Sequence, residues 1–138
     1  MLAVGSGSGA PLLFADGVAA GFPSPAQDYQ EDVIDLNREL VLHPASTFCV
    51  RVRGDSMRDA GVANGDILVV DRSLPATEGC IAVCILDGDF TVKRFHQSRG
   101  RVELRPANPD YRPIEVGPGQ SFEVWGVVAW TLHRHLGR

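Results

Sequence analysis

Hydrophobic and polar positions alternate along much of the chain after residue 46, and this period of two predicts β-strands. In TFCVRVRG (47–54) the large apolar residues fall on one face and the arginines on the other. DILVVD (66–71) is a nearly continuous apolar run, which is typical of a strand buried on both sides. GCIAVCILDGDFTVKRFH (79–96) has two strand-like runs around Asp-Gly-Asp, which predicts a hairpin. Further strands are expected in RVELRPAN (101–108), IEVGPG (114–119) and SFEVWGVVAWTLHR (121–134). Turn signals about every ten residues predict a mostly-β domain, a curled sandwich or open barrel.

The first part of the chain has a different pattern. Residues 1 to about 27 are rich in Gly, Ala, Ser and Pro without a clear period, which predicts a flexible N-terminal arm. Within residues 28–44, apolar side chains recur near helical spacing and a proline closes the segment. This predicts one short helix over about Asp35 to Leu42. We therefore expect an arm, residues 1–27, followed by a single domain, residues 28–138.

Composition narrows the class of protein. The chain has 138 residues, 44% hydrophobic and 22% charged, with a net charge of −4, as in an ordinary soluble domain. The negative balance gives no reason to expect direct nucleic-acid binding, which usually needs a basic surface. No run approaches the roughly 20 apolar residues of a membrane-spanning helix. The first twenty residues contain no Lys or Arg, and PLLF is too short for the core of a signal peptide. We expect a cytoplasmic protein without a membrane partner.

Cysteine and histidine usage gives no metal site. Cys49, Cys80 and Cys84 are odd in number, form no Cys-x-x-Cys, and lie in apolar strand-like runs, so we expect buried free thiols. His133 and His135 flank an arginine in what is predicted to be a polar C-terminal tail. No metal and no cofactor are expected.

Ser56 is a candidate nucleophile. In RVRGDSMRDAG (51–61), a predicted strand ends, Gly54 permits a tight bend, and Ser56 opens what looks like a helical turn. Such a position exposes a hydroxyl beside free backbone N–H groups. Asp-Ser before a turn is also the usual signature of a helix cap. A Ser-His-Asp triad stays open, but none of the four histidines has an acidic neighbour in the sequence that would orient it.

Lys93 is the other candidate base, because it is the only lysine among thirteen basic residues. It lies in the predicted strand DFTVKRFH, with Thr91 and Phe95 on its own face. Lysine loses its proton when desolvated, whereas arginine stays charged. A pKa lowered by three to four units would make Lys93 a base, at a cost of about 4–5 kcal/mol. A lone lysine in a strand is usually a solvated edge residue. Lys93 is therefore either such a surface charge or the base of a Ser-Lys pair.

Several motifs in a fixed order resemble one known family. They are AGFPSPA (20–26), IDLN (34–37), GDSM (54–57), NGDILVVD (64–71), DGDFTVKR (87–94) and WGVV (125–128). Together they resemble the self-cleaving domain of the LexA/UmuD family of SOS-response proteins, from about Val18 to Trp130. The resemblance implies a curled β-sandwich like the C-terminal domain of that family, with one short helix and a flexible arm.

The resemblance also assigns roles to five positions. Ser56 corresponds to the nucleophile and Lys93 to its general base, and the backbone N–H groups of Ser56 and Asp55 correspond to the oxyanion hole. The peptide bond cut would be Ala20-Gly21, within the same chain. Ala20 stands where short members of the family have Cys, and it is small enough for the same pocket. Tethering raises the effective concentration of the bond, so a weak nucleophile suffices.

The implied partners are those of the family's short members. They include a second copy of the chain, with FEVWGVVAWTL (122–132) as a possible interface, and a RecA–single-stranded DNA filament that stimulates cleavage. Residues 21–138 would then serve a UmuC-like Y-family translesion polymerase, with the replicative sliding clamp as a further contact. The twenty residues before the predicted cut are too few for the winged helix-turn-helix of LexA, so repression of DNA is not expected.

Two other functions fit parts of the sequence. In a non-catalytic polymerase-binding module, Ser56 would be a cap and Lys93 a surface charge. A signal-peptidase-like processing protease would also use a Ser-Lys pair, but it would require a membrane anchor.

Overall fold

The computed structural model describes residues 2–3, 12–16, 20–23 and 30–137. The chain divides into two compact units, one formed by Gly5–Leu42 and the other by Met1–Val4 with His43–Arg138. The larger unit carries an eight-stranded sheet and the smaller one a two-stranded sheet.

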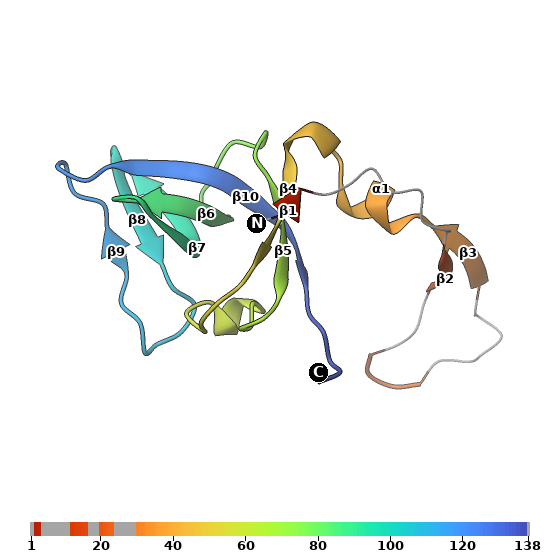
Figure 1. Ribbon diagram of the computed structural model, residues 1–138. Coiled ribbons are helices and arrows are strands. Elements are labelled where there is room, and N and C mark those ends of the chain that lie inside the picture. The colour runs from red at the N-terminus through yellow and green to blue at the C-terminus, as the bar shows by residue number, and fades with distance from the viewer. Residues whose placement is uncertain (1, 4–11, 17–19, 24–29, 138) are drawn as a thin grey trace. The chain divides into compact units, whose positions relative to one another are not determined.

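The larger unit is one antiparallel sheet with the strand order β1-β4-β5-β10-β6-β7-β8-β9 (Figure 1). This confirms the prediction of a mostly-β fold, and every strand expected after residue 46 is present. Two short 3-10 turns, η2 (Pro44–Ser46) and η3 (Arg58–Ala60), precede and follow the first long strand. The strands are β1 (Leu2–Ala3), β4 (Thr47–Arg51), β5 (Ile67–Asp71), β6 (Ile81–Leu86), β7 (Asp89–Ser98), β8 (Arg101–Arg105), β9 (Ile114–Glu115) and β10 (Phe122–Leu132).

Strand β10 joins the two halves of this sheet. Its first half pairs with β6 and its second half with β5, and the register shifts between Val124 and Gly126 and again between Val128 and Trp130. Figure 1 shows β10 as the long blue strand that passes from the β6–β9 side to the β5 side. Such irregularities bend a strand and increase its twist. They give the sheet its curled form.

Burial on both faces of the sheet follows the hydrophobic pattern. Leu68, Val69 and Val70 in β5 are at most 2% exposed, as predicted for a strand covered on both sides. Strand β6 divides its side chains, with Val83 in one core cluster and Ala82 and Cys84 in the other. The first cluster contains Val52, Met57, Val62, Leu68, Val70, Val83 and Trp125, and the second contains Ala82, Cys84, Phe95 and Leu104.

The predicted hairpin sets the register of the strand that carries Lys93. Asp87 and Gly88 connect β6 to β7 with φ angles of 49° and 86°, and two residues with positive φ are typical of the tightest hairpin turns. The turn places Leu86 opposite Asp89 and, further along, Ala82 opposite Lys93. The position of Lys93 in the sheet thus follows from the Asp-Gly turn.

The smaller unit pairs β2 (Leu12–Asp16) with β3 (Gln30–Ile34), which is followed by helix α1 (Leu36–Leu40). The Asp35 carboxylate caps α1 by accepting from the backbone N–H of Asn37 at 3.1 Å. The predicted helix is therefore present but ends two residues early, because the backbone is already extended at Val41. Most of the predicted arm lies outside the described residues. Within it, residues 12–16 form a strand, and Ala20 and Gly21 lie in a bend.

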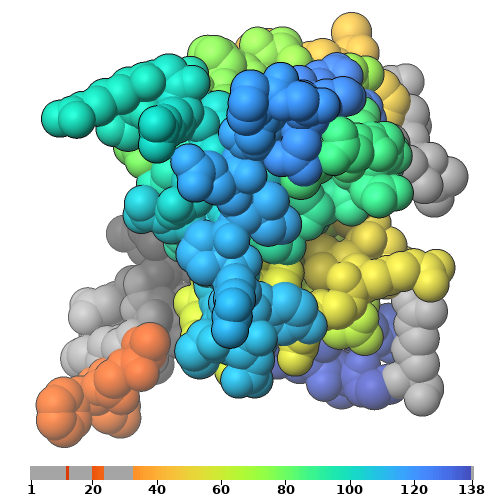
Figure 2. Space-filling view, turned by 90° about the vertical axis from the view of Figure 1, so that its left-hand side faces the viewer, coloured from red at the N-terminus to blue at the C-terminus, as the bar shows by residue number. Residues whose placement is uncertain are grey.

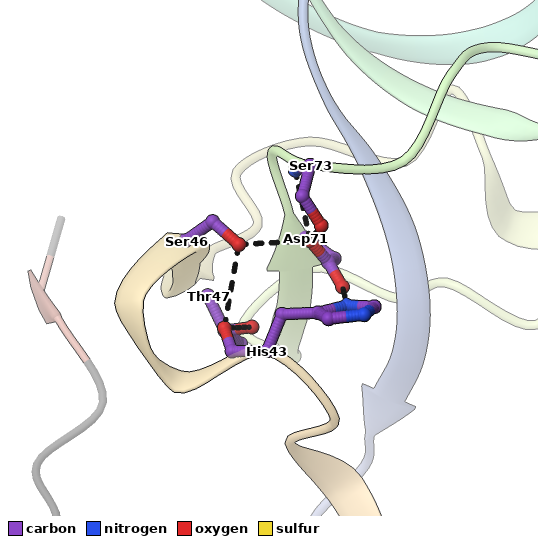
Figure 3. A network of polar contacts seen from close by, with 5 residues as sticks. All are labelled: His43, Ser46, Thr47, Asp71 and Ser73. Atoms are coloured by element: carbon purple, nitrogen blue, oxygen red, sulfur yellow. Dashed lines mark hydrogen bonds and ion pairs between the residues drawn. The ribbon is translucent and has the colours of Figure 1, made fainter.

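A polar network fixes the point where the larger unit begins (Figure 3). The Asp71 carboxylate, at the end of β5, is 4% exposed and lies 2.5 Å from Nδ1 of His43. It also accepts from the Ser73 hydroxyl at 2.6 Å and the Ser46 hydroxyl at 3.3 Å. Burial alone would raise the pKa of Asp71, but the hydrogen bonds from Ser73 and His43 outweigh it and lower the pKa to about 2.

Candidate active site

Ser56 lies in a sharp turn between β4 and η3. Gly54 opens the turn with a φ of 90°, a conformation that glycine adopts without strain. Its N–H donates to Oδ1 of Asn64 at 2.8 Å, which ties the bend to the loop before β5. Met57, directly after Ser56, is 2% exposed and packs in the first core cluster. The turn is therefore anchored in the core on one side while Ser56 itself stays half-buried.

Lys93 reaches Ser56 from β7, 37 residues along the chain. Its Nζ lies 2.9 Å from Oγ of Ser56 and 2.9 Å from Oγ1 of Thr91, and it donates to the carbonyl of Val92 at 3.1 Å. Lys93 is only 8% exposed, so it is not a solvated edge residue. The structure brings together the two side chains that the sequence singled out separately.

The surroundings of Lys93 favour the neutral amine. Burial lowers the pKa of Lys93, and the nearby Cys84 thiol opposes this effect more weakly. Burial, with Cys80 as a second cause, raises the pKa of Cys84 to about 11, so this group is a neutral thiol near pH 7. Lys93 has no ion pair with a carboxylate anywhere in the described part of the chain. A buried lysine without a counter-charge loses its proton more readily than one in water.

A cavity of about 440 Å³ opens beside this pair. One wall is the end of β4 and the residues after it, Val50 to Gly54, and the other is Phe90 to Lys93 in β7. In β7 the pairing with β8 begins only at Arg94, so among the described residues the segment 89–93 pairs on one edge alone, with β6. A free strand edge on an apolar cavity has the hydrogen-bonding groups to hold an extended peptide.

Backbone donors are available next to the Ser56 hydroxyl. Within residues 30–137, the N–H groups of Asp55 and Ser56 have no hydrogen-bond acceptor, although both carbonyls are occupied. The Asp55 carbonyl accepts from Nδ2 of Asn108 at 2.9 Å, and the Ser56 carbonyl accepts from the N–H of Ala107 at 2.8 Å. Free N–H groups beside a nucleophile are what an oxyanion hole requires.

The histidines do not complete a triad with Ser56. Among the hydrogen bonds of the described residues, the Ser56 hydroxyl contacts Lys93 and no imidazole. The rings of His133 and His135 pack edge to face, 4.9 Å apart. The other imidazole contacts are with carboxylates: His43 with Asp71, His96 with Glu78 and His133 with Asp66.

Three contacts at the site could not be foreseen. Thr91 was placed on the face of Lys93 by the period of the strand, but its hydrogen bond to Nζ was not. Asn108 and Ala107, which hold the Ser56 turn, follow β8 and lie about fifty residues from the turn in the sequence. Asn-Pro-Asp at 108–110 indicates only a turn. No local signal links it to Ser56.

The antiparallel sheet thus brings Ser56 and Lys93 together at one cavity. Residues 11–129 match the family described as Peptidase S24-like, so the chain belongs to the Peptidase S24-like family. The resemblance to the LexA/UmuD family inferred from short motifs is confirmed. No helix in the described residues is long and apolar enough to cross a membrane.

Relatives match over most of the chain. Protein MucA of Salmonella typhimurium is 44% identical over 119 residues, which cover 86% of this chain and 81% of MucA. Protein ImpA of the same species is 45% identical over 124 residues, 88% of this chain and 83% of ImpA. LexA repressor 2 of Xanthomonas axonopodis pv. citri (strain 306) is 42% identical over 115 residues, which cover 83% of this chain and 54% of that repressor.

Proposed function

We propose that this chain is a UmuD-like, self-cleaving serine peptidase of the bacterial SOS response that cuts its own Ala20-Gly21 bond. The observation that carries the proposal is the 2.9 Å contact between Nζ of Lys93 and Oγ of Ser56, with Lys93 buried. A lysine that served only as a surface charge would be exposed to water and would not lie against a serine hydroxyl.

The three contacts of Lys93 match what a neutral amine can do. An ammonium group donates all three of its hydrogen bonds, whereas an amine has two N–H groups and one lone pair. The Val92 carbonyl and the Thr91 hydroxyl can accept from the two N–H groups. The lone pair then faces the Ser56 hydroxyl, which donates its proton to Lys93. Thr91 and Val92 thereby orient the base.

The reaction follows from this arrangement. Lys93 takes the proton of Ser56, whose Oγ attacks the carbonyl carbon of Ala20. The negative oxygen of the tetrahedral intermediate accepts from the N–H groups of Ser56 and Asp55. Collapse breaks the bond to Gly21, and the amine of Gly21 leaves with the proton held by Lys93. Water, activated by the same lysine, then hydrolyses the ester between Ser56 and Ala20.

Two features suit the predicted substrate. The free edge of β7 and the facing residues after β4 can hold an extended segment by its backbone, and the cavity walls suit small apolar side chains such as Ala20. Because the segment belongs to the same chain, its effective concentration is high without tight binding.

The wider role is proposed from the relatives. Similarity to MucA, ImpA and a LexA repressor supports a cytoplasmic protein of SOS mutagenesis. In this role a RecA–single-stranded DNA filament favours the cleavable conformation. The cut form, residues 21–138, acts as a homodimeric accessory subunit of a UmuC-like Y-family polymerase, and the sliding clamp is a further contact.

The test is incubation of the purified chain at alkaline pH, with and without RecA filament. We expect a fragment that begins at Gly21, identified by N-terminal sequencing and mass. Ser56→Ala and Lys93→Ala should abolish it, and Lys93→Arg should too, because arginine keeps its proton. Ser98→Ala, a change of an exposed serine outside the site, is the matched control and should cleave normally. If the wild-type chain stays intact even with RecA filament, the protein is a non-catalytic binding module instead.

A further inference from the structure

A short segment after β8 holds the Ser56 turn by its carbonyls. Nδ2 of Asn108 donates to the Asp55 carbonyl, and the N–H of Ala107 donates to the Ser56 carbonyl. The Tyr111 hydroxyl adds a contact of 2.7 Å to the Asp55 side chain. Figure 2 looks onto the face where this segment, in light blue, lies next to yellow atoms of the segment that carries Ser56.

The contact made by Asn108 fixes the direction of a backbone donor. The Asp55 carbonyl and the Ser56 N–H belong to the same peptide group, and in a trans peptide these two bonds point in opposite directions. The N–H of Arg58 also donates to the Asp55 carbonyl, at 3.2 Å, so the shorter bond from Asn108, at 2.9 Å, sets the plane of this group together with it and keeps the Ser56 N–H turned away from residues 107–108. This N–H is one of the two donors proposed for the oxyanion.

Asn108 is itself held firmly. It is 5% exposed, and its Oδ1 accepts from the N–H of Asp110 at 3.0 Å and lies 3.4 Å from Nη2 of Arg58. The N–H of Tyr111 donates to the Asn108 carbonyl at 3.1 Å, which closes a turn around Pro109. With both ends of its amide engaged, Asn108 has one rotamer that serves all of its partners. The donor to Asp55 is thus preorganised.

We propose that Asn108 is a positioning residue for the oxyanion hole, acting through the Asp55–Ser56 peptide group. The inference rests on the proposed function, since it concerns the same reaction. Without the Asn108 donor the Asp55 carbonyl keeps only the longer bond from the N–H of Arg58, so this peptide group can rotate and the Ser56 N–H no longer points at the developing negative charge. The contacts of Lys93 with Thr91 and Val92 are untouched by the change.

The test compares Asn108→Asp and Asn108→Ala with the wild type across a pH series. Aspartate keeps the size of the side chain and the Oδ1 acceptor, but it puts a carboxylate oxygen where the donor was. Alanine removes the donor without adding charge. We expect both variants to lower the alkaline plateau rate of self-cleavage by about tenfold or more, since losing one oxyanion donor costs about 10²–10³. The midpoint of the pH profile, which reports Lys93, should stay where it is.

Tyr111→Phe is the matched control. It removes a contact from the same segment to the same residue, but to the Asp55 carboxylate instead of the backbone carbonyl. Its plateau rate should stay within about twofold of the wild type, and thermal melting should show all four proteins folded at the assay temperature. A plateau rate unchanged in both Asn108 variants, or a slowing that moves the pH midpoint as well, overturns the proposal.

A second measurement does not depend on cleavage. In ¹⁵N–¹H spectra of uncut protein, the Ser56 amide signal should move in both Asn108 variants and stay in place in Tyr111→Phe. If the wild type never cleaves, the proposed function fails, and the spectra still decide whether Asn108 orients this peptide group. An unmoved Ser56 signal refutes that role by itself.

Discussion

Gly126 in β10 is the position where the fold leaves least room for a side chain. A Cβ added there would lie 2.5 Å from Cγ1 of Val70 and 3.2 Å from Cγ of Arg72. Carbon atoms in contact sit about 3.5–4.0 Å apart, so β10 or β5 would have to move by about 1 Å. Val70 is fully buried in the first core cluster and cannot swing into solvent.

We therefore expect Gly126→Ala to lower the free energy of unfolding by about 1–3 kcal/mol, the usual cost of overpacking a core. For a chain of this size each kcal/mol corresponds to a fall in melting temperature of roughly 4 °C. Urea titration followed by circular dichroism measures the loss, and an unchanged slope would show that the unfolded state is the same.

Gly119 provides the control for Gly126. A Cβ added at Gly119 meets nothing within 4 Å, so Gly119→Ala should change the free energy of unfolding by less than about 0.5 kcal/mol. If Gly126→Ala unfolds at the same urea concentration as Gly119→Ala, the close approach of β10 to β5 is absent in solution and the reasoning is refuted.

Three further predictions concern titratable groups. The rate of self-cleavage should rise about tenfold per pH unit and reach its plateau below pH 10.4, the ordinary pKa of lysine, because burial lowers the pKa of Lys93. A plateau reached only above pH 10.4 would contradict the burial argument. Lys93→Met should raise the free energy of unfolding at pH 7, because burial disfavours the charged lysine that the unfolded chain carries at this pH. The gain, measured by urea titration, should shrink as pH rises towards 10.4, where the lysine of the unfolded chain loses its proton too. An equal gain at pH 7 and near pH 10 would contradict this linkage. Asp71→Asn should lower the free energy of unfolding at pH 7 by about 1–3 kcal/mol. The contribution of the Asp71 carboxylate to stability is complete above the ordinary aspartate pKa near 4 and is lost as pH falls through about 2, so the difference between variant and wild type should vanish in thermal melts in acid. The control Asp89→Asn changes an exposed carboxylate and should show little difference at any pH.

Much of the sheet could be predicted because its signals are local. The apolar run before Asp71 gave a strand covered on both sides, and the Asp-Gly pair after Leu86 gave the hairpin with its register. The helix was placed by its apolar spacing and the proline that follows, but Val33 belongs to β3 although it has helical spacing to Leu36. Over so few residues the two periods are hard to tell apart, and pairing with β2 decides.

The state of Lys93 could not be predicted, because burial is a property of contacts that lie far apart in the sequence. Period placed Lys93 in a strand and gave it Thr91 as a neighbour, but a strand position alone is compatible with an edge open to water. In the folded chain the turn at Ser56 and the residues after β4 lie next to Lys93 on β7, although they are far from it in the sequence. Only the order of several motifs, which reflects the whole fold, pointed to this arrangement.

The turn at Ser56 is distinguished by which of its backbone groups have partners. The carbonyls of Asp55 and Ser56 are both occupied, while their N–H groups have no acceptor among the described residues. If Ser56 were a helix cap, its hydroxyl would accept from the N–H of Arg58 or Asp59. Those two N–H groups donate instead to the carbonyls of Asp55 and Ala107. The Ser56 hydroxyl lies 2.9 Å from Nζ of Lys93. The turn therefore holds its carbonyls, leaves two N–H groups open and places its hydroxyl beside a buried amine, which is what the proposed attack on a substrate carbonyl requires and what a helix cap does not.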